Sequence, residues 1–195
     1  GLLTDKRLIE SLEGITKSAK YFSSTIDDFR DFFKQNKDKE NFKIKDTFKK
    51  TMSLISNQLH NNEIVVVDKI EDTSVFGLEN ELIQVLINIL NNSKDELVKK
   101  ENQELLIFIK AYSKNKKLCI EIKDNAGGID NEIINRIFEP YFTTKHKSQG
   151  TGIGLYMSEE IIVKNLQGKI SVSNKEYIYN NENYFGAEFS IVLNT

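Results

Sequence analysis

Asp124-Asn-Ala-Gly-Gly-Ile129 and Gly150-Thr-Gly-Ile-Gly-Leu155 together contain five of the ten glycines in this chain of 195 residues. Glycine lets the backbone adopt a positive φ and approach a ligand closely. A glycine-rich loop that opens a helix directs free N–H groups at an anion. An acidic residue before one glycine turn and Gly-x-Gly-x-Gly before an apolar helix therefore favour a nucleotide site.

An asparagine-rich stretch, Gln84-Val-Leu-Ile-Asn-Ile-Leu-Asn-Asn-Ser-Lys-Asp-Glu96, precedes both glycine clusters. Asn88 and Asn92 are four residues apart, so they share one face of a helix, while the apolar neighbours face the opposite way. Two neutral carboxamide oxygens suit Mg²⁺ that is already coordinated mostly by phosphates and water. Alone, this spacing is more typical of an exposed polar face. Combined with the glycine clusters, it predicts a nucleoside triphosphate bound with a metal ion.

Asp124 stands at the end of a predicted strand, where a turn begins. A carboxylate there can accept a hydrogen bond from the exocyclic amine of adenine, and guanine has an acceptor at the equivalent position. The alternative is a turn aspartate that bonds only its own backbone. The second cluster is neither a Walker loop, because no Gly-Lys-Ser/Thr follows, nor a convincing Rossmann fingerprint. We expect the N–H groups of Gly152, Ile153 and Gly154 to bind phosphate.

Ile137-Phe-Glu-Pro-Tyr-Phe-Thr-Thr-Lys145 lies between the glycine clusters. Phe138 and Phe142 can anchor an otherwise mobile segment by packing, which places Thr143, Thr144 and Lys145 near a phosphate tail. Such a segment is typical of a lid that closes over a nucleotide.

Composition excludes several other classes of function. The net charge of −2 gives no basic footprint for nucleic acid. One cysteine excludes an internal disulfide, and two histidines with that cysteine do not make the usual zinc site. The apolar runs are far shorter than a membrane span, so we expect no direct membrane contact.

The first part of the chain is predicted to be one long helix. Its apolar residues recur in steps of four and three from Leu8 to Phe33, which is a heptad seam, and it should end near Asn36. Because one amphipathic helix cannot bury its own stripe, we expect a homodimer, a missing partner helix, or both. The alternative is a helix folded back on the next domain. We divide the chain into residues 1–45, this helix with a linker, and residues 46–195, a globular domain.

The globular part mixes helical and strand-like patterns. Helices are predicted at Asp46–Leu59, Gly77–Val98, Asn131–Phe138 and Gly154–Asn165. Strands are predicted at Glu63–Asp68, Glu104–Tyr112, Leu118–Lys123, Lys169–Ser173 and Phe185–Leu193, with a polar hairpin extension at 174–183. We expect an α+β fold: a two-layer α/β sandwich whose mixed, mostly antiparallel sheet is covered by helices on one face, preceded by the long coiled-coil-type helix.

Together these motifs resemble the ATP-binding catalytic domain of bacterial sensor histidine kinases. The wider superfamily includes type II topoisomerases, heat-shock chaperones and mismatch-repair ATPases. The matches are Asn88–Asp95 to the N box, Asp124–Gly128 to the first glycine box, Ile137–Lys145 to the F box and Gly150–Leu155 to the second glycine box. Gly186-Ala-Glu-Phe189 resembles a weaker last box. The order and spacing match over residues 46–195, and four boxes in order are specific where one alone is not.

The resemblance implies that the chain binds ATP or ADP with Mg²⁺, that Asn88 and Asn92 hold the metal, and that Asp124 reads adenine. The implied nucleotide-binding residues are Asn88, Asn92, Asp95, Asp124, Gly128, Ile129, Phe138, Thr143, Thr144, Lys145, Gly150, Thr151, Gly152, Ile153, Gly154 and Leu155. Asp95 stands where many members have lysine, so we expect no lysine contact to phosphate from this helix. Ala126 stands where glycine is frequent.

The first helix adds to the resemblance, because its stretch from Ser24 to Phe33 looks like the end of the second helix of a dimerisation hairpin. The first helix of that hairpin carries the phosphoacceptor histidine. Neither His60 nor His146 has the acidic residue and downstream proline that follow the acceptor. We therefore expect the acceptor outside this chain, and no autophosphorylation by the chain alone. The implied partners are a second copy through the N-terminal helix, the phosphoacceptor helix and a response regulator receiver domain, around a cytoplasmic catalytic core.

Three alternatives remain open at this point. One is an ATPase clamp of the same superfamily, although hydrolytic members use a glutamate base where this chain has Asn88. Another is a non-catalytic scaffold whose pocket does not bind nucleotide. The third is a serine kinase of the anti-sigma type, which shares the pocket and differs in target.

Overall fold

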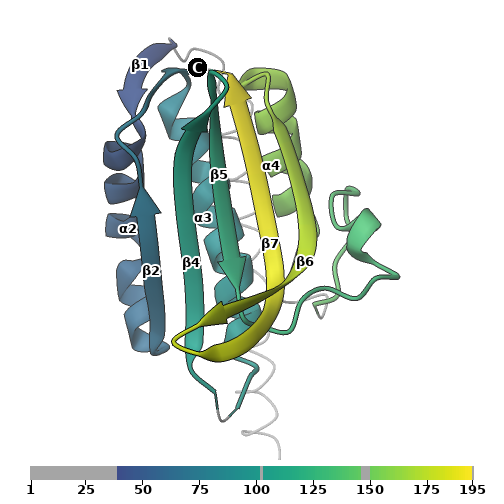
Figure 1. Cartoon of the computed structure of the whole chain (residues 1–195). Helices are drawn as coiled ribbons and strands as arrows, with labels where there is room; N and C mark the ends of the chain where they lie inside the picture. Colours follow the sequence, from purple (N-terminus) through teal and green to yellow (C-terminus); the bar gives the residue numbers. More distant parts are fainter. Residues whose placement is uncertain (1–38, 102, 146–149, 195) are drawn as a thin grey trace, which may run out of the picture.

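The computed structural model describes residues 39–101, 103–145 and 150–194 (Figure 1). The predicted heptad helix from Leu8 to Phe33 lies outside these residues, so the helix and its division from the globular part stay predictions. Within the described ranges, no helix combines the length and the apolar character needed to cross a membrane.

A mixed five-stranded sheet forms one layer, in the order β2-β4-β5-β7-β6. Strand β2 (Ile64–Ile70) runs parallel to β4 (Leu105–Lys114). The other neighbours are antiparallel: β4 with β5 (Lys117–Asp124), β5 with β7 (Glu182–Asn194), and β7 with β6 (Lys169–Tyr179). The predicted mixed, mostly antiparallel sheet is therefore confirmed.

Helices α2 (Ile44–Asn61), α3 (Glu79–Leu97) and α4 (Gly154–Glu160) cover one face of this sheet (Figure 1). The core lies between the two layers, because every second residue of the central strands faces the helices. Ile89 of α3 and Ile120 of β5 are both fully buried in it. The two-layer α/β sandwich is confirmed, and Asn88 and Asn92 of α3 stay only partly buried, whereas Ser93 is buried.

Two short strands, β1 (Glu40–Lys43) and β3 (Ser74–Gly77), pair in a separate small sheet. The pairing buries Phe42 and Val75. Four-residue strands with so few buried positions give no clear alternation, which is why the sequence pattern does not predict them.

The segment Asn131–Phe138 is not the predicted helix but a series of turns around a 3-10 helix at Ile134–Arg136. Its backbone bonds mostly join residues three apart, as in Arg136 N–H to Ile133 O and Glu139 N–H to Arg136 O. The predicted helix Gly154–Asn165 is confirmed in extent, but its last part, Ile161–Asn165, is a π-helix.

Strands β6 and β7 continue through the predicted polar extension as one hairpin, paired as far as Tyr179 with Glu182. Asn180 and Asn181 form its turn with φ of 50° and 65°. Positive φ at both central residues is the type I′ arrangement, which fits the twist of a hairpin and which asparagine tolerates.

Candidate nucleotide-binding site

A cavity of about 530 Å³ lies between α3, the turn after β5 and the segment before α4. It is lined by all of the sequence-predicted site residues except Phe138 and Ile153. Phe138 packs against the hydrophobic core instead. The N–H of Ile153 donates to Thr151 Oγ1 at 3.1 Å, so it is already used inside the glycine loop.

Asn88 and Asn92 project from α3 into this cavity, one helical turn apart. Asn88 Nδ2 donates to Ser158 Oγ of α4 at 2.8 Å, and Ser158 in turn donates to Gly154 O at 3.1 Å. The two bonds tie the polar face of α3 to the start of α4. Asn88 is thereby oriented by a neighbouring helix, and the glycine loop that opens that helix is placed against α3.

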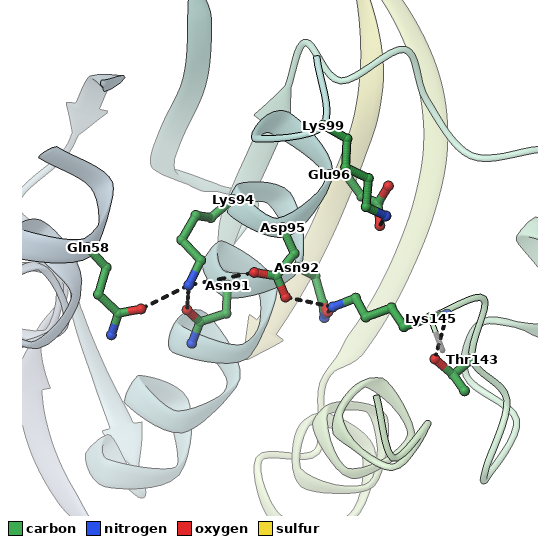
Figure 2. A network of polar contacts seen from close by, with 9 residues as sticks. All are labelled: Gln58, Asn91, Asn92, Lys94, Asp95, Glu96, Lys99, Thr143 and Lys145. Carbon is green, nitrogen blue, oxygen red and sulfur yellow. Dashed lines mark hydrogen bonds and ion pairs between the residues drawn. The ribbon is translucent and has the colours of Figure 1, made fainter. Parts of the chain in front are cut away.

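Figure 2 shows the cationic side chains around the C-terminal half of α3. Lys145 Nζ donates to Asp95 Oδ2 at 2.7 Å and lies 3.4 Å from Asn92 Oδ1. The backbone N–H of Lys145 donates to Thr143 Oγ1 at 3.1 Å. Lys94 comes from the same turn of α3 but directs its ammonium to Gln58 Oε1 of α2 at 2.8 Å. The cation beside Asn92 therefore comes from the segment before the second glycine cluster.

Asp124 is the buried acid of the cavity, with 3% of its surface exposed. Oδ1 accepts from the backbone N–H of Ala126 at 3.0 Å and of Ala187 at 3.3 Å, and Oδ2 accepts from Ser93 Oγ at 3.0 Å. Burial raises the pKa of this carboxyl above its ordinary value, and the three hydrogen bonds oppose that shift. A carboxylate oxygen has room for a second donor, so Oδ2 can accept from a ligand while it stays fixed by Ser93.

The segment before α4 is held at its base by packing and by a close backbone approach. Phe142 lines the cavity and packs against the core, and the Arg136 guanidinium lies 4.6 Å from its ring centroid. Gly152 has a φ of 65°, and a Cβ there would stand 2.4 Å from the carbonyl carbon of Tyr141. Only glycine lets the two backbones pass this closely, so the second glycine cluster and the aromatic segment fix each other.

The side-chain oxygens of the cavity fit a Mg²⁺ ion that the phosphates of a bound nucleotide also coordinate. Within the described ranges, no group of three or more His, Cys, Asp or Glu side chains could hold a metal ion. Among the oxygens that line the cavity, the carboxamides of Asn88 and Asn92 lie one helical turn apart on α3, and such a pair fits a Mg²⁺ whose other ligands are phosphate oxygens and water.

Ten further residues line the cavity without having been predicted from the sequence. They are Asn91, Ser93, Glu96, Ala126, Asp130, Ile133, Ile137, Phe142, Ala187 and Phe189. Ser93 had a detectable signal, because a hydroxyl in the buried stripe of a helix must find a polar partner. The strand residues Ala187 and Phe189 had two weak signals, the two-residue spacing that every buried strand shows and their place in the stretch that resembles the last box.

Comparison with known sequences supports the assignment of these motifs. The profile of the family described as histidine kinase-, DNA gyrase B-, and HSP90-like ATPase matches residues 77–195. Sporulation kinase A of Bacillus subtilis is 32% identical over 142 residues, which is 72% of this chain and 22% of that protein. The two-component sensor PprA of Pseudomonas aeruginosa is 35% identical over 104 residues, 52% of this chain and 11% of PprA. The chain thus spans less than a quarter of these relatives.

Solved structures show the same fold. The catalytic domain of histidine kinase ThkA superposes with a TM-score of 0.66 at 24% identity, covering 80% of this chain and 95% of that one. Histidine kinase ThkA in complex with response regulator protein TrrA gives a TM-score of 0.71 at 20% identity, over 92% of this chain and 48% of that one. With the family profile matching more than half of its residues, the chain belongs to the histidine kinase-, DNA gyrase B- and HSP90-like ATPase family, a family of ATP-binding domains.

Proposed function

We propose that the chain is the ATP-binding catalytic domain of a sensor histidine kinase, which transfers the γ-phosphoryl group of ATP to a histidine outside this chain. One observation carries the proposal: Asn92, Asp124 and Lys145, from three distant segments, line a single cavity. In this proposal, the fixed buried carboxylate of Asp124 marks the base end of the cavity, and the carboxamides with Lys145 mark its phosphate end. This is the arrangement that a purine base with a phosphate tail requires.

At the base end, Asp124 Oδ2 would accept from the exocyclic amine of adenine. Guanine has an oxygen at that position, which would face the buried carboxylate without a proton between them. An unpaired buried charge is costly, so the site should discriminate between the two bases.

At the phosphate end, Asn88 and Asn92 would hold Mg²⁺, which neutralises charge on the phosphates when bound. Thr143 and Thr144 offer hydroxyl donors, and Lys145 can exchange its partner Asp95 for a phosphate oxygen. The domain then contributes positioning and charge neutralisation, with no covalent step on its own side chains.

The choice between a kinase and an ATPase depends on Asn88. Hydrolytic members of the superfamily use a glutamate base at this position, and a carboxamide cannot take a proton from water. The Nδ2 of Asn88 is also already bonded to Ser158. This favours transfer to a nucleophile that arrives from elsewhere. His60 is exposed in the last turn of α2 and lacks the acceptor pattern.

The partners follow from the same proposal. A second copy would join through the predicted N-terminal helix, the phosphoacceptor helix would approach the cavity mouth, and a response regulator would take the phosphoryl group. The likeness to ThkA, solved with a response regulator, supports the last partner. The catalytic core would work in the cytoplasm.

Calorimetric titration of ADP and of a non-hydrolysable ATP analogue, with and without Mg²⁺, tests the proposal. We expect Asn92→Ala to abolish the Mg²⁺ dependence and Asp124→Ala to abolish binding, while Asn183→Ala, an exposed asparagine on β7, binds like the wild type. A folded wild type that binds neither nucleotide would overturn the proposal. Stable radiolabel on this chain from γ-labelled ATP would overturn the external acceptor.

A further inference from the structure

The β6–β7 hairpin contacts β4, a strand that is not its neighbour in the sheet. In the sheet, β6 is separated from β4 by β7 and β5. Yet the rings of Tyr177 and Tyr179 on β6 both lie 5.0 Å from the ring of Phe108 on β4, in edge-to-face contact. The outer half of the hairpin therefore bends across the sheet face opposite the helices, as Figure 1 shows.

The inner half of the same hairpin clamps the end of the glycine turn that follows Asp124. Asn174 Oδ1 accepts from the N–H of Ile129 at 2.8 Å, and Asn174 Nδ2 donates to the carbonyl of Ile129 at 2.7 Å. One carboxamide thus satisfies both backbone groups of a residue that lines the cavity. In a sheet, the backbone of a neighbouring strand would bond these two groups, but here a side chain does so.

The beginning of the turn is fixed from the same side. Tyr177 Oη donates to the carbonyl of Asp124 at 3.1 Å, and Gly127 N–H donates to the carbonyl of Phe185 at 3.0 Å. Gly186 passes so close that a Cβ on it would stand 1.7 Å from Asp124 O. The hairpin therefore contacts both ends of the turn that would lie along the base.

The turn needs such support, because two of its residues are glycines with positive φ and carry no side chains that could anchor it. Without external bonds, the backbone from Ala126 to Ile129 would sample many conformations. A site recognises its ligand strongly when this freedom has been removed before binding.

We propose that Asn174 and Tyr177 are positioning residues that set how strongly the site discriminates adenine from other purines. The inference depends on the proposed nucleotide site. It goes beyond that site because it assigns base selectivity to two hairpin residues that do not line the cavity themselves. Asn174 fixes the Ile129 end of the turn, and Tyr177 fixes the Asp124 end. Together they keep Asp124 Oδ2 at hydrogen-bond distance from an amine on the bound base.

The test compares ADP with inosine diphosphate, which has an oxygen where adenine has the amine. In the wild type, ADP should bind more tightly than inosine diphosphate. In Asn174→Ala, we expect ADP affinity to fall about tenfold and inosine diphosphate affinity to change less than about twofold. The ratio of ADP affinity to inosine diphosphate affinity should therefore become smaller. Asn174→Asp keeps the acceptor for Ile129 N–H but turns a carboxylate oxygen towards the Ile129 carbonyl oxygen, so ADP affinity should fall at least as far as in Asn174→Ala.

Tyr177→Phe removes one hydroxyl and keeps the ring against Phe108, so it should fold normally and reduce ADP affinity about threefold. Matched controls come from the same hairpin. Asn183→Ala removes an exposed carboxamide, and Tyr184→Phe removes a hydroxyl that donates to Glu182 away from the turn. Both controls should keep the wild-type ratio, and the melting temperature is recorded for every variant.

The outcomes separate the two proposals. A wild type that binds ADP, with variants whose ratio narrows at an unchanged melting temperature, supports the positioning role. Equal losses for both nucleotides, or no loss at all, would overturn it and leave the nucleotide site standing. If the folded wild type binds neither nucleotide, the proposed function fails and this inference fails with it.

Discussion

The two ends of the cavity are built differently. At the base end, Asp124 is buried, accepts three hydrogen bonds from the protein and is followed by a turn whose ends are clamped by the β6–β7 hairpin. At the phosphate end, the side chains of Asp95 and Lys145 are 40% and 21% exposed and bond mainly to each other. In the proposed site, base recognition would therefore be set before a ligand arrives, whereas the charged groups would exchange partners when phosphate enters.

Gly186→Ala should produce the largest effect on stability and binding, because it disturbs the packed backbone around Asp124. The new Cβ would stand 1.7 Å from the carbonyl oxygen of Asp124, and both atoms belong to paired strands that cannot move apart cheaply. We expect a loss of about 3 kcal/mol in the free energy of unfolding, with no ADP binding under conditions where the wild type binds. Chemical denaturation followed by circular dichroism measures the first effect.

Gly77→Ala is the matched control. A Cβ at Gly77 would stand 3.1 Å from Leu166 Cδ2, the far end of a side chain that can rotate away, and in ordinary contact with Phe42 Cε1 at 3.8 Å. Its effect on stability should stay below about 1 kcal/mol. Similar losses in both variants would show that the strands near Asp124 yield more easily than the contacts indicate.

Asp124→Asn should separate binding from stability at the same end. The variant places an amide where the carboxylate would accept from adenine, so ADP affinity should fall about thirtyfold. Its Oδ1 can still accept from the N–H groups of Ala126 and Ala187, so the fold should persist. Calorimetry of the folded variant measures the affinity, and an unchanged value would contradict the role of Asp124 in reading the base.

The difference in stability between the wild type and Asp124→Asn should depend on pH with a defined sign. Burial raises the pKa of Asp124 in the folded protein above its value of 3.8. The folded state therefore binds this proton more tightly than the unfolded state, and stability falls as pH rises from about 4 through the folded pKa. The asparagine variant exchanges no proton here. Thermal denaturation measured across that window should show the melting temperature of the variant rising relative to that of the wild type, and an unchanged or falling difference would contradict the raised pKa of Asp124.

Much of the fold could be predicted because its elements are long and periodic. The stripe of α3 from Leu82 to Leu97 and the alternation in β5 each bury one face, and tertiary packing follows these patterns. The cavity could be predicted because its glycine clusters and polar helix face have spacings with a chemical meaning. Helix α3 brings Asn88 and Asn92 together by its own geometry.

What could not be predicted depends on contacts between distant residues. Nothing in the local sequence distinguishes Asn174 from other polar residues of the hairpin. Its role depends on hydrogen bonds to Ile129, which lies 45 positions earlier in the chain. Phe138 packs against the core, as expected of an anchor of its segment, but it does not line the cavity, where the resemblance implied contact with nucleotide. The bend of the hairpin across the open sheet face likewise depends on Phe108, which reads locally as an ordinary strand residue.

Asp95→Asn tests whether the Asp95–Lys145 ion pair limits binding at the phosphate end. In the structure, Lys145 Nζ donates to Asp95 Oδ2 at 2.7 Å, so a phosphate must compete for this ammonium. Removing the charge should free Lys145 and raise the affinity for the ATP analogue about threefold. Because both side chains are partly exposed, the free energy of unfolding should change by less than about 1 kcal/mol.

A double-mutant cycle shows whether the gain acts through Lys145. With Lys145→Met alone, affinity for the analogue should fall, and adding Asp95→Asn to it should give little further gain. If the full gain persists without Lys145, Asp95 acts by direct repulsion of the phosphates instead. Equal effects on ADP and on the ATP analogue would place the pair away from the terminal phosphate.

Lys94→Met should have the smallest effect, although Lys94 is next to Asp95 in sequence and carries the same charge as Lys145. Its ammonium donates to Gln58 Oε1 of α2 at 2.8 Å and Asn91 Oδ1 at 3.0 Å, and lies 3.6 Å from Asp95 Oδ1 (Figure 2). Affinity for the ATP analogue should therefore change by less than about twofold, because only a screened, longer-range attraction is lost. A loss as large as that of Lys145→Met would mean that Lys94 leaves Gln58 when nucleotide binds. In that case α3 supplies a phosphate-binding cation after all, and the phosphate end rearranges more than the contacts of the free protein show.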